Sequence, residues 1–422
     1  MLLASTHSTP KTKDTASSST RNMHQHRAQK TILLVDLLDD GHHQMFMGLV
    51  IDYLISLGHN VTCFCSDPSS VSRRAESRGY SQSIGKLKTI YFETKHRRGM
   101  RNVRYGRVNR WLSLTWGVIR YKVRPTRILL LYGDSFTLEN TPSVLRRCVK
   151  LFLDLAFPWK WTALYFHPYR FRSQRLDPTK QQPLYDIVFK ARSCKGVGIF
   201  DEILLSSVAK DFRRPVVHIP DVHYLPVACC AGASGMSSTI VQQSNGRFIV
   251  VLLGILQRRK NLLNLLQAAQ LLPRQKFYFA ICGSLVRGQY HPCELDRIDM
   301  LVGGSENIFF HPYLLSEVDF HGVASVANAF YAAYSGFPHS SNIMTVAAFQ
   351  QVPVLVGKGF LMQERAVRYK TGVAVDETSV QEIADSISNL PAFDNISAGW
   401  DAYLADHSLS TFHARLRQLL SL

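Results

Sequence analysis

The stretch that decides the fold of this chain reads Phe248-Ile-Val-Val-Leu-Leu-Gly254-Ile-Leu-Gln-Arg-Arg-Lys260-Asn261, and Phe277-Tyr-Phe-Ala-Ile-Cys-Gly283 follows it. Each segment opens with a short apolar run, which is typical of a strand buried on both faces of a parallel sheet. Between them, residues 261–272 show helical apolar spacing and end at Pro273. Strand, glycine turn, helix and strand make one βαβ unit, so the sequence predicts a parallel α/β sheet.

The same pattern appears in the first half of the chain. Residues 31–35 and 60–65 are apolar runs, and the helical segment 45–57 between them ends at Gly58. We therefore expect an α/β fold of two Rossmann-like domains that face each other across a cleft, where such folds bind ligands. Further strands are predicted at residues 89–92, 127–132, 163–166, 196–200, 216–219, 308–311, 329–333, 352–356 and 372–375, and further helices at 342–349, 362–368 and 379–389.

The domain boundaries follow from shifts in composition. Residues 223–246 are rich in Ala, Gly, Ser and Gln, so we interpret them as a linker between the domains. The expected order is a disordered tail (1–29), a first domain (30–222), the linker (223–246), a second domain (247–392) and C-terminal helices (393–422) that pack back toward the first domain.

Composition excludes several classes of protein. With 46% apolar and 19% charged residues, the chain is not wholly disordered, and no apolar run reaches the roughly 18 residues of a membrane span. The eight cysteines are scattered, without zinc-site or disulfide-framework spacing, and Cys63 and Cys65 fall in a predicted buried strand. Residues 1–30 lack the layout of a signal peptide. We expect a cytosolic protein with reduced thiols.

The net positive charge of the chain comes entirely from residues 1–246. The formal net charge is +18; residues 1–246 contain 35 Lys and Arg against 17 Asp and Glu, whereas residues 247–422 contain 14 against 14. Residues 71–127 alone contain 16 basic and 2 acidic residues. This asymmetry predicts an anionic partner for the first half, either a membrane surface or a nucleic acid.

The loop after residue 253 is a candidate phosphate site. It begins with Gly254, contains Arg258, Arg259 and Lys260, and leads directly into a helix. Backbone N–H groups at a helix N-terminus, its dipole and a lysine together suit a diphosphate. A solvated basic loop is the alternative reading.

With these segments in place, the chain resembles the group-1, family-4-like retaining glycosyltransferases of GT-B fold, which use nucleotide sugars. The glycine loop at Gly41 and the end of the first helix at Gly58 agree with this family, so the resemblance covers roughly residues 30–390. It implies an acceptor domain followed by a nucleotide-sugar domain. In the second domain, the matching residues are Gly254, Lys260, Asn261, Ala268, Ala269, Leu272 and Gly283.

The chain also departs from the family pattern. Ile255 stands where the family has an arginine, and Pro338 and Val346 stand where it has two glutamates, which contact the sugar and the ribose. The nearest polar groups are those of Ser340, Ser341 and Asn342 at a predicted helix N-terminus, which we expect to bind the donor. The alternative is that Ser341 or Asn342 only caps the helix.

Two histidines are the candidate catalytic residues. His167 follows a predicted strand at the position where family members often have a histidine near the transferred sugar, and His339 falls on the same cleft in this alignment. A histidine that merely ends a strand is the alternative for His167. His42 and His43 beside Gly41 lack a third ligand at a regular spacing, so we expect no metal.

One basic stretch favours a membrane surface. Arginines recur every three residues, and tryptophans follow them, which fits an anionic bilayer. The resemblance supports this reading because acceptors of such transferases are commonly lipid-linked. RNA binding and an ordinary solvated helix over the first sheet are the competing interpretations. The residues expected to bind the membrane or the acceptor are Arg101, Arg104, Arg107, Arg110, Trp111 and Trp116.

The resemblance implies the function. We expect transfer of a sugar from a nucleotide-diphosphate sugar to a glycan or lipid-linked acceptor in surface polysaccharide assembly, without cofactor, metal or nucleic acid. The protein would be cytoplasmic and peripheral to the inner face of the membrane. A catalytically inactive relative that binds a glycan or a partner transferase is the alternative, because both family glutamates are replaced.

Overall fold

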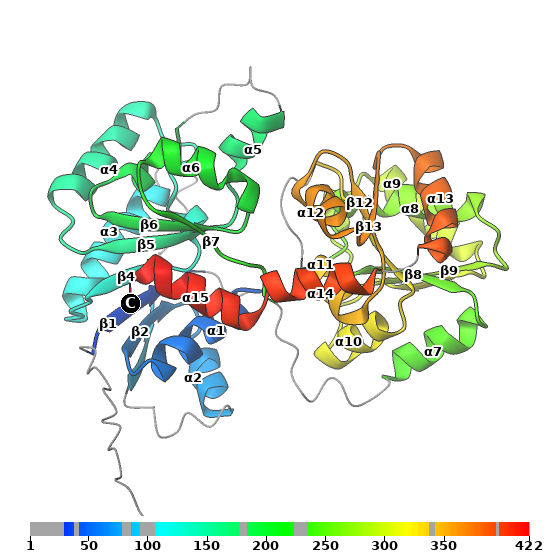
Figure 1. The fold of residues 1–422 in the computed structure, drawn as a ribbon, viewed down its shortest axis with the longest axis horizontal. Helices are drawn as coiled ribbons and strands as arrows, with labels where there is room; N and C mark the ends of the chain where they lie inside the picture. Colours follow the sequence, from blue (N-terminus) through cyan, green and yellow to red (C-terminus); the bar gives the residue numbers. More distant parts are fainter. Residues whose placement is uncertain are drawn as a thin grey trace, which may run out of the picture.

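The computed structural model describes residues 29–37, 42–77, 86–92, 106–176, 184–222, 234–336, 342–393 and 396–421. These residues form two parallel sheets with helices on both faces, which lie side by side in Figure 1. The expected α/β class with two Rossmann-like domains is confirmed. Among the described residues, no helix combines the length and the apolar character needed to cross a membrane.

The first sheet has the strand order β3-β2-β1-β4-β5-β6-β7. Every neighbouring pair is parallel, so all carboxyl ends lie at one edge. Its strands are β1 (Thr31–Val35), β2 (Asn60–Cys65), β3 (Leu87–Tyr91), β4 (Arg127–Leu130), β5 (Trp161–Tyr165), β6 (Cys194–Ile199) and β7 (Val216–His218). Its helices are α1 (His42–Ser56), α2 (Pro68–Ser77), α3 (Gly106–Arg120), α4 (Ser143–Leu155), α5 (Tyr169–Leu176) and α6 (Leu205–Phe212).

The second sheet has the order β10-β9-β8-β11-β12-β13 and is again parallel throughout. Its strands are β8 (Phe248–Leu253), β9 (Phe277–Cys282), β10 (Ile308–His311), β11 (Ala329–Ala332), β12 (Val354–Gly357) and β13 (Gly372–Val375). The remaining helices are α7 (Gly235–Ser244), α8 (Leu262–Leu271), α9 (Pro292–Gly303), α10 (Glu317–Ser325), α11 (Ile343–Gln350), α12 (Leu361–Tyr369), α13 (Val380–Asn389), α14 (Ser397–Asp406) and α15 (Leu409–Leu420).

The predicted strands are present, and some of their boundaries differ from the prediction by one or two residues. The difference at β12 has a local cause. β12 starts two residues later than predicted because the Val352 N–H donates to Ala347 O and thereby closes α11 (3.2 Å). Pro353, the next residue, has no N–H to give to a sheet. Cys63 and Cys65 are buried in β2, as predicted.

Part of the predicted linker, residues 235–244, is a helix. The Ser234 side chain accepts the N–H of Ser237 (3.1 Å) and caps α7, whose Ile240 is buried in the core of the second domain. The small polar composition hid this helix, because only two of its residues, Met236 and Ile240, pack against the core of the second domain. The linker prediction is therefore wrong for residues 235–244, and residues 223–233 lie outside the described part of the chain.

The last helix, α15, belongs to the core of the first domain although it follows α14 of the second. Figure 1 shows the two in succession between the sheets, with α15 over the first sheet. Phe412 packs edge-on against Phe46 of α1, with ring centroids 5.3 Å apart, and His413 stacks on Tyr53. The chain therefore connects the domains a second time.

A buried arginine on α12 joins the second domain to the first. The side chain of Arg365 is 1% exposed. Its guanidinium donates to Asp221 Oδ2 (2.5 Å), to Glu202 Oε2 (2.8 Å) and to the carbonyl oxygen of Phe200 (2.8 Å), all in the first domain. A buried guanidinium needs acceptors in fixed directions, so these contacts restrict how the domains can rotate.

A second set of ion pairs runs in the opposite direction. Arg172 of α5 pairs with Asp201 in its own domain and reaches Glu364 of α12 (2.8 Å), which also accepts from Arg175 (2.9 Å). Glu364 and Arg365 are consecutive, so one turn of α12 exchanges charges with the first domain in both directions. We call Arg365, Glu202, Asp221, Arg172, Glu364 and Asp201 the interdomain cluster.

The interdomain cluster fixes the ionisation states of Glu202, one of its members, and of the neighbouring His407. Burial alone would raise the pKa of Glu202, but the charge and hydrogen bonds of Arg365 outweigh it and lower that pKa to about 2. Burial, with Arg365 nearby, lowers the pKa of His407 to about 3, so its neutral ring accepts the Asp221 N–H at Nδ1 (3.1 Å). Both groups keep these states at neutral pH.

We predict that Arg365→Met lowers stability by about 3–5 kcal/mol, because Glu202 and Asp221 lose the cation that compensates their burial. The thermal midpoint should fall by roughly 4–10 °C. Arg368→Met is the matched control: this arginine is also on α12, but it is 58% exposed and lies 3.5 Å from Asp406, so its removal should cost below about 1 kcal/mol. Equal midpoints for the two variants would contradict the role given to Arg365.

Candidate active site

The candidate site lies where the carboxyl ends of the two sheets face each other, the usual ligand position in such folds. The first domain contributes residues 132–136 after β4 and residues 166–169 after β5, and the second contributes the loop after β8. The two sides interact electrostatically. Burial and Asp134 raise the pKa of Tyr169, while the guanidinium of Arg259 from the second domain opposes the rise.

Asp134 organises the first-domain side. Its carboxylate accepts the backbone N–H of Phe166 (2.8 Å) and of His167 (2.9 Å), so it fixes the chain where β5 ends. The same carboxylate lies 3.3 Å from His167 Nδ1, and the Tyr132 hydroxyl lies 3.0 Å from that nitrogen. Tyr169 stacks on the imidazole with ring centroids 5.7 Å apart. His167 is therefore held in one orientation at the cleft edge.

Gly133 makes this arrangement possible. A Cβ at this position would lie 2.8 Å from Leu164 O and 3.0 Å from Ala163 Cβ, both in β5. Only a glycine lets the turn Gly133–Phe136 approach β5 closely enough for Asp134 to reach the N–H groups that follow that strand.

Lys260 is the central cation of the second-domain side. It is 8% exposed, its Nζ donates to Leu253 O at the end of β8, and it lies 5.3 Å from the centroid of the Tyr334 ring. Burial, together with Arg259, lowers its pKa to about 7. Within the described ranges, no carboxylate pairs with Lys260. A buried amine next to another cation and without a counter-charge is stabilised in its charged form when an anion binds beside it. This part of the site therefore favours an anionic ligand.

The two arginines before Lys260 have different roles. Arg258 donates twice to Glu294 of α9 (Nε–Oε1 3.0 Å, Nη2–Oε1 2.9 Å), which fixes the loop. The Arg259 guanidinium lies 5.8 Å from the centroid of the Tyr334 ring, so Arg259 and Lys260 share one aromatic surface. Ile255, which is 50% exposed, stands where the family has an arginine and provides no charge. Arg259, in the same loop, provides a second cation beside Lys260.

Gly254 and Asn261 shape the loop. Gly254 has φ +95°, and a Cβ there would lie 3.1 Å from Lys260 Nζ. Asn261 has φ +58°, a conformation that asparagine tolerates better than most residues. Its amide donates to Glu377 O, which Asn264 also contacts (2.9 Å). These contacts set where α8 begins, with its first N–H groups at the carboxyl edge of the sheet.

The segment before α11 is described only in part. Asn342 lies directly before α11 with helical backbone angles and makes no side-chain capping hydrogen bond there, which speaks against the capping alternative for this residue. Val346, at the position of the second family glutamate, is 3% exposed within the core of the second domain. His339, Ser340, Ser341 and Gly41 lie outside the described residues.

Part of the basic stretch on α3 faces the core of the first domain and not the solvent. Trp111 was expected at a membrane or acceptor surface, but it is 1% exposed, and its indole donates to Phe136 O (3.0 Å) inside the first core. Arg107 binds Thr137 (2.6 Å) and Glu139 (2.7 Å), and Arg110 donates to Ser135 O (2.6 Å). Helical periodicity alone did not show which face of α3 meets the sheet. Trp116 is 63% exposed; Arg101 and Arg104 lie outside the described residues.

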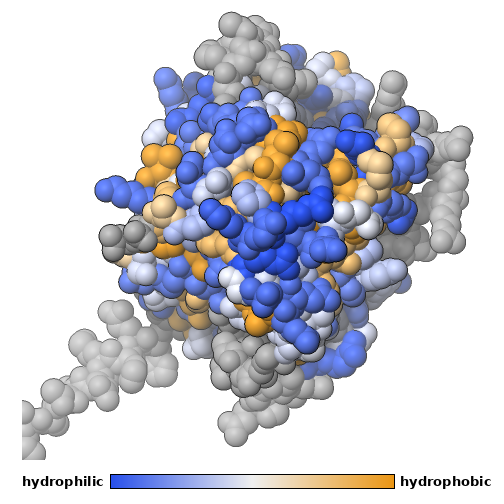
Figure 2. All heavy atoms as spheres, turned by 90° about the vertical axis from the view of Figure 1, so that its right-hand side faces the viewer, coloured by the Kyte–Doolittle hydropathy of each residue, from blue (hydrophilic) through white to orange (hydrophobic). Residues whose placement is uncertain are grey.

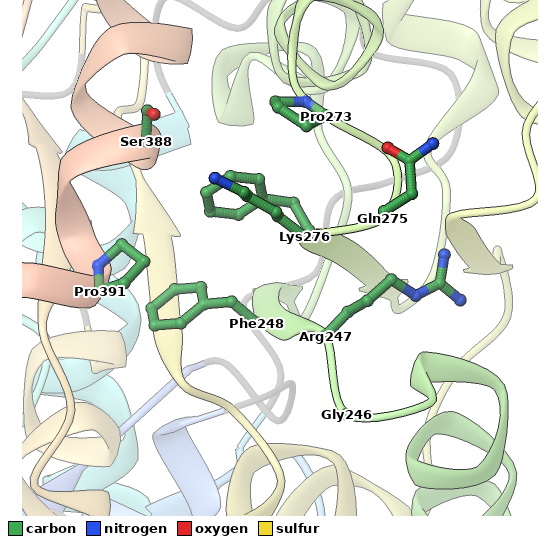
Figure 3. A pocket seen from close by; sticks show the side chains of 9 residues that line it. Gly246, Arg247, Phe248, Pro273, Gln275, Lys276, Ser388 and Pro391 are labelled. Atoms are coloured by element: carbon green, nitrogen blue, oxygen red, sulfur yellow. The ribbon is translucent and has the colours of Figure 1, made fainter.

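A cavity of about 510 Å³ lies elsewhere, at the amino ends of β8 and β9. Figure 3 shows the Phe248 ring directed toward Pro391, whereas Arg247 extends away from the centre. This cavity is at the opposite edge of the sheet from Lys260, so it is not part of the candidate site. The part of the chain that the structure describes contains no group of three His, Cys, Asp or Glu side chains able to hold a metal ion.

Asp134, Tyr132 and Arg259 were not singled out as site residues from the sequence. A signal existed for the first two: Tyr132 and Asp134 lie two and four residues after the end of β4, and the ends of neighbouring parallel strands meet at one edge. Arg259 is adjacent to Lys260, but the sequence does not tell which of the loop cations turns toward the cleft.

Comparison with known proteins places this geometry in a familiar fold. No family model and no curated protein matches the chain. Among solved structures, a glycosyltransferase from Rickettsia africae matches with a TM-score of 0.64 and 14% identity over 93% of this chain and 99% of its own. Sucrose-phosphate synthase from Thermosynechococcus elongatus matches with 0.65 and 16% identity over 93% and 98%. HepE from Anabaena, in complex with UDP and glucose, matches with 0.63 and 12% identity over 93% and 100%.

These matches extend over nearly the whole chain, and at such identities they establish the fold alone. The chain therefore has the GT-B fold that its resemblance implies. A structure described as a UDP-N-acetylglucosamine 2-epimerase from Listeria monocytogenes also matches, with a TM-score of 0.57 and 10% identity over 93% and 95%. Because one fold can carry different activities, the function depends on the residues of the site.

We predict that anion binding at this site takes up protons. A diphosphate beside Lys260 stabilises the ammonium form and raises its pKa above the value of about 7. With UDP as the probe, affinity should fall as pH rises above 7, by up to about tenfold per unit, because free Lys260 is then neutral. The second pKa of a phosphate, about 6, is already passed in this range.

Titration calorimetry in buffers of different ionisation enthalpy measures this proton uptake. Lys260→Met should bind UDP more weakly and lose the pH dependence. Lys276→Met, which removes an exposed cation from the cavity at the other edge, is the control and should change neither. Wild-type affinity that does not vary between pH 7 and pH 9 would rule out Lys260 as the anion ligand.

Proposed function

We propose that the protein is a glycosyltransferase that moves a sugar from a nucleotide-diphosphate sugar to a glycan or lipid-linked acceptor in surface polysaccharide assembly. One observation carries the proposal. Two neighbouring cations, Lys260 and Arg259, share the Tyr334 ring at the end of β8, and Arg259 acts electrostatically on Tyr169 beside the oriented His167. The two cations suit the charged diphosphate of a donor, and the histidine on the facing side suits the reacting sugar.

The division between the domains follows from their charges. In the second domain, Lys260, Arg259 and the N-terminus of α8 suit the diphosphate of the donor. UDP is the first nucleotide to test, because HepE, which has the same fold, was solved with UDP and with UDP-glucose. The first domain, with His167 at its edge, then receives the sugar and the acceptor.

In this reaction the residues of the site have two roles, stabilising the leaving phosphate and orienting the sugar. As the bond between the sugar and the diphosphate breaks, negative charge grows on the leaving phosphate, and Lys260 and Arg259 stabilise it in a partly water-excluded site. His167, held by Asp134, lies on the sugar side and orients the donor. We expect the anomeric configuration to be retained, as the resemblance implies. No metal is needed if the two cations neutralise the leaving group.

The missing family glutamates require a replacement. We propose that Ser340, Ser341 and Asn342, with the first N–H groups of α11, bind the donor at this position. His339 is a second candidate next to the sugar. Buried Val346 cannot contact a ligand, so the lost ribose contact has to come from these neighbouring polar groups.

The same substitutions support an alternative, an inactive relative that binds a glycan or a partner. Each lost hydrogen bond to a charged group is worth about 1.5–3 kcal/mol, so a chain without a replacement would hold a nucleotide sugar weakly. The alternative is distinguished from the enzyme by turnover, not by binding.

The test is UDP release from a panel of UDP-sugars, with and without lipid extracts as acceptors. We predict turnover with one donor. His167→Ala should lower kcat at least about tenfold, which is about 1.4 kcal/mol, with an unchanged Kd for UDP, because His167 is on the sugar side. Asp134→Asn should act in the same direction. His413→Ala, in α15 away from the cleft, is the control.

Each outcome is informative. Binding of UDP-sugars without turnover, for every donor and extract, would favour the inactive relative. A wild-type protein that binds no nucleotide sugar at millimolar concentration would overturn the proposed function. A His167→Ala variant with full activity would remove this histidine from the site.

A further inference from the structure

Helix α3 carries an exposed apolar stripe on the side away from its sheet. Leu112, Trp116 and Ile119 are 53%, 63% and 57% exposed and follow one another at intervals of four and three residues. That spacing places the three side chains on one face of the helix. The opposite face is buried through Trp111, among other residues.

Helix α4 carries a second stripe with the same spacing. Val144, Leu151 and Leu155 are 71%, 56% and 72% exposed, and exposed Cys148 fills the remaining position between them. A water-soluble helix normally presents polar side chains on this face. In α4, apolar side chains lie on the exposed face as well as on the face toward the sheet, where Val149 and Leu153 are buried.

The two stripes belong to one side of the first domain. Buried residues of α3 and α4 join the same core cluster, with β1, β4 and β5, whereas α1 and α15 cover the other face of the sheet. Figure 1 shows α3 and α4 at the same outer side of this domain. We call Leu112, Trp116, Ile119, Val144, Cys148, Leu151 and Leu155 the docking face.

The surroundings of the docking face are basic. Residues 106–160 contain 10 Lys and Arg but only 3 Asp and Glu. Two of these acids are already paired, Glu139 with Arg107 and Asp154 with Lys150. Arg120 and Arg147 are exposed beside the stripes. An apolar surface of this kind, with cations next to it, marks an interaction site for an anionic partner.

We propose that the docking face binds an anionic lipid bilayer, with α3 and α4 lying along its surface. Exposed aliphatic side chains enter the headgroup boundary, and the neighbouring arginines attract anionic lipids. The binding itself does not depend on the proposed function, but the delivery of a lipid-linked acceptor to the site does.

The chemistry favours a bilayer over two other partners. RNA would need several aromatic groups for its bases to stack on, but Trp116 is the one aromatic side chain of the docking face, and the stripe of α4 offers a thiol and aliphatic side chains instead. A second copy would bring the same positive charge against itself, which costs free energy when like charges meet. A bilayer of anionic lipids satisfies both the apolar stripes and the charge.

The docking face is directly connected to the candidate site. At the start of α3, Arg107 donates to Asp134 O (3.3 Å) and Arg110 donates to Ser135 O (2.6 Å). Asp134 in turn fixes His167. A protein that rests on α3 and α4 therefore holds the end of β5 close to the membrane surface, where a lipid-linked acceptor would enter.

The far end of the molecule provides a control surface. Figure 2 shows this end of the second domain, where hydrophobic side chains form small groups between hydrophilic ones. Val241 of α7 and Leu271 of α8 are 50% and 55% exposed, similar to the docking face, but their helices pack in the second domain, where residues 247–422 carry no net charge. Their removal should not affect a bilayer contact through α3 and α4.

The experiment is flotation of the full chain with vesicles of equal parts phosphatidylglycerol and phosphatidylcholine, compared with pure phosphatidylcholine. We expect binding to the anionic vesicles at low salt and release at about 1 M salt, where the Debye length is about 3 Å. The combined variant Trp116→Ser, Leu151→Ser and Leu155→Ser should lose at least tenfold in partition. Arg120→Glu with Arg147→Glu should lose roughly fivefold for each cation removed. Val241→Ser with Leu271→Ser should bind as the wild type does.

Three results would overturn the proposal. They are absence of binding to anionic vesicles, equal binding by the docking-face and control variants, and wild-type dimers that only the docking-face variant abolishes. Tight RNA binding that displaces the vesicles would assign the basic surface to nucleic acid instead. Hydrolysis of a UDP-sugar in solution, measured in parallel, separates this question from the proposed function, because it should be the same in all these variants.

Discussion

The orientation of the two domains depends on Arg365. A guanidinium that is 1% exposed must find acceptors for its donors, and Arg365 finds three of them across the domain boundary, on Glu202, Asp221 and the Phe200 carbonyl. Any rotation that separates them leaves charges buried without partners, which costs several kcal/mol. The interdomain cluster thus holds the carboxyl edges of the two sheets toward each other, and the electrostatic influence of Arg259 on Tyr169 is one consequence.

The candidate site combines two electrostatically different halves. On the second domain, Lys260 and Arg259 lie near one aromatic ring, and burial lowers the pKa of each. On the first domain, the carboxylate of Asp134 holds a histidine by two backbone hydrogen bonds and a contact to the ring. An anionic leaving group on one side and a reacting sugar on the other would complete both halves, which is the physical basis of the proposed glycosyl transfer.

Much of the fold could be predicted from local pattern, because a strand in a parallel sheet is a short apolar run wherever it occurs. Residues 248–253 and 277–282 needed no further information. Long-range partners could not be predicted. Nothing local marks Arg365 as buried, since its acceptors are more than 140 residues away in the sequence. Trp111 looked like an interfacial anchor because the pattern of α3 has apolar residues on two faces, and only the packed sheet decides between them. In the site, Lys260 and His167 could be picked out from the sequence as candidates, whereas Asp134 and Arg259 depend on how strand ends and domains meet.

The central claim is that a nucleoside diphosphate binds between Arg259 and Lys260 at the end of β8. A structure of the full chain with UDP tests it most directly. We predict diphosphate oxygens at hydrogen-bond distance, about 3 Å, from Lys260 Nζ and the Arg259 guanidinium, with the outer phosphate on the side of His167. A diphosphate seated instead beside Arg247 and Lys276, at the opposite edge of the second sheet, would contradict it.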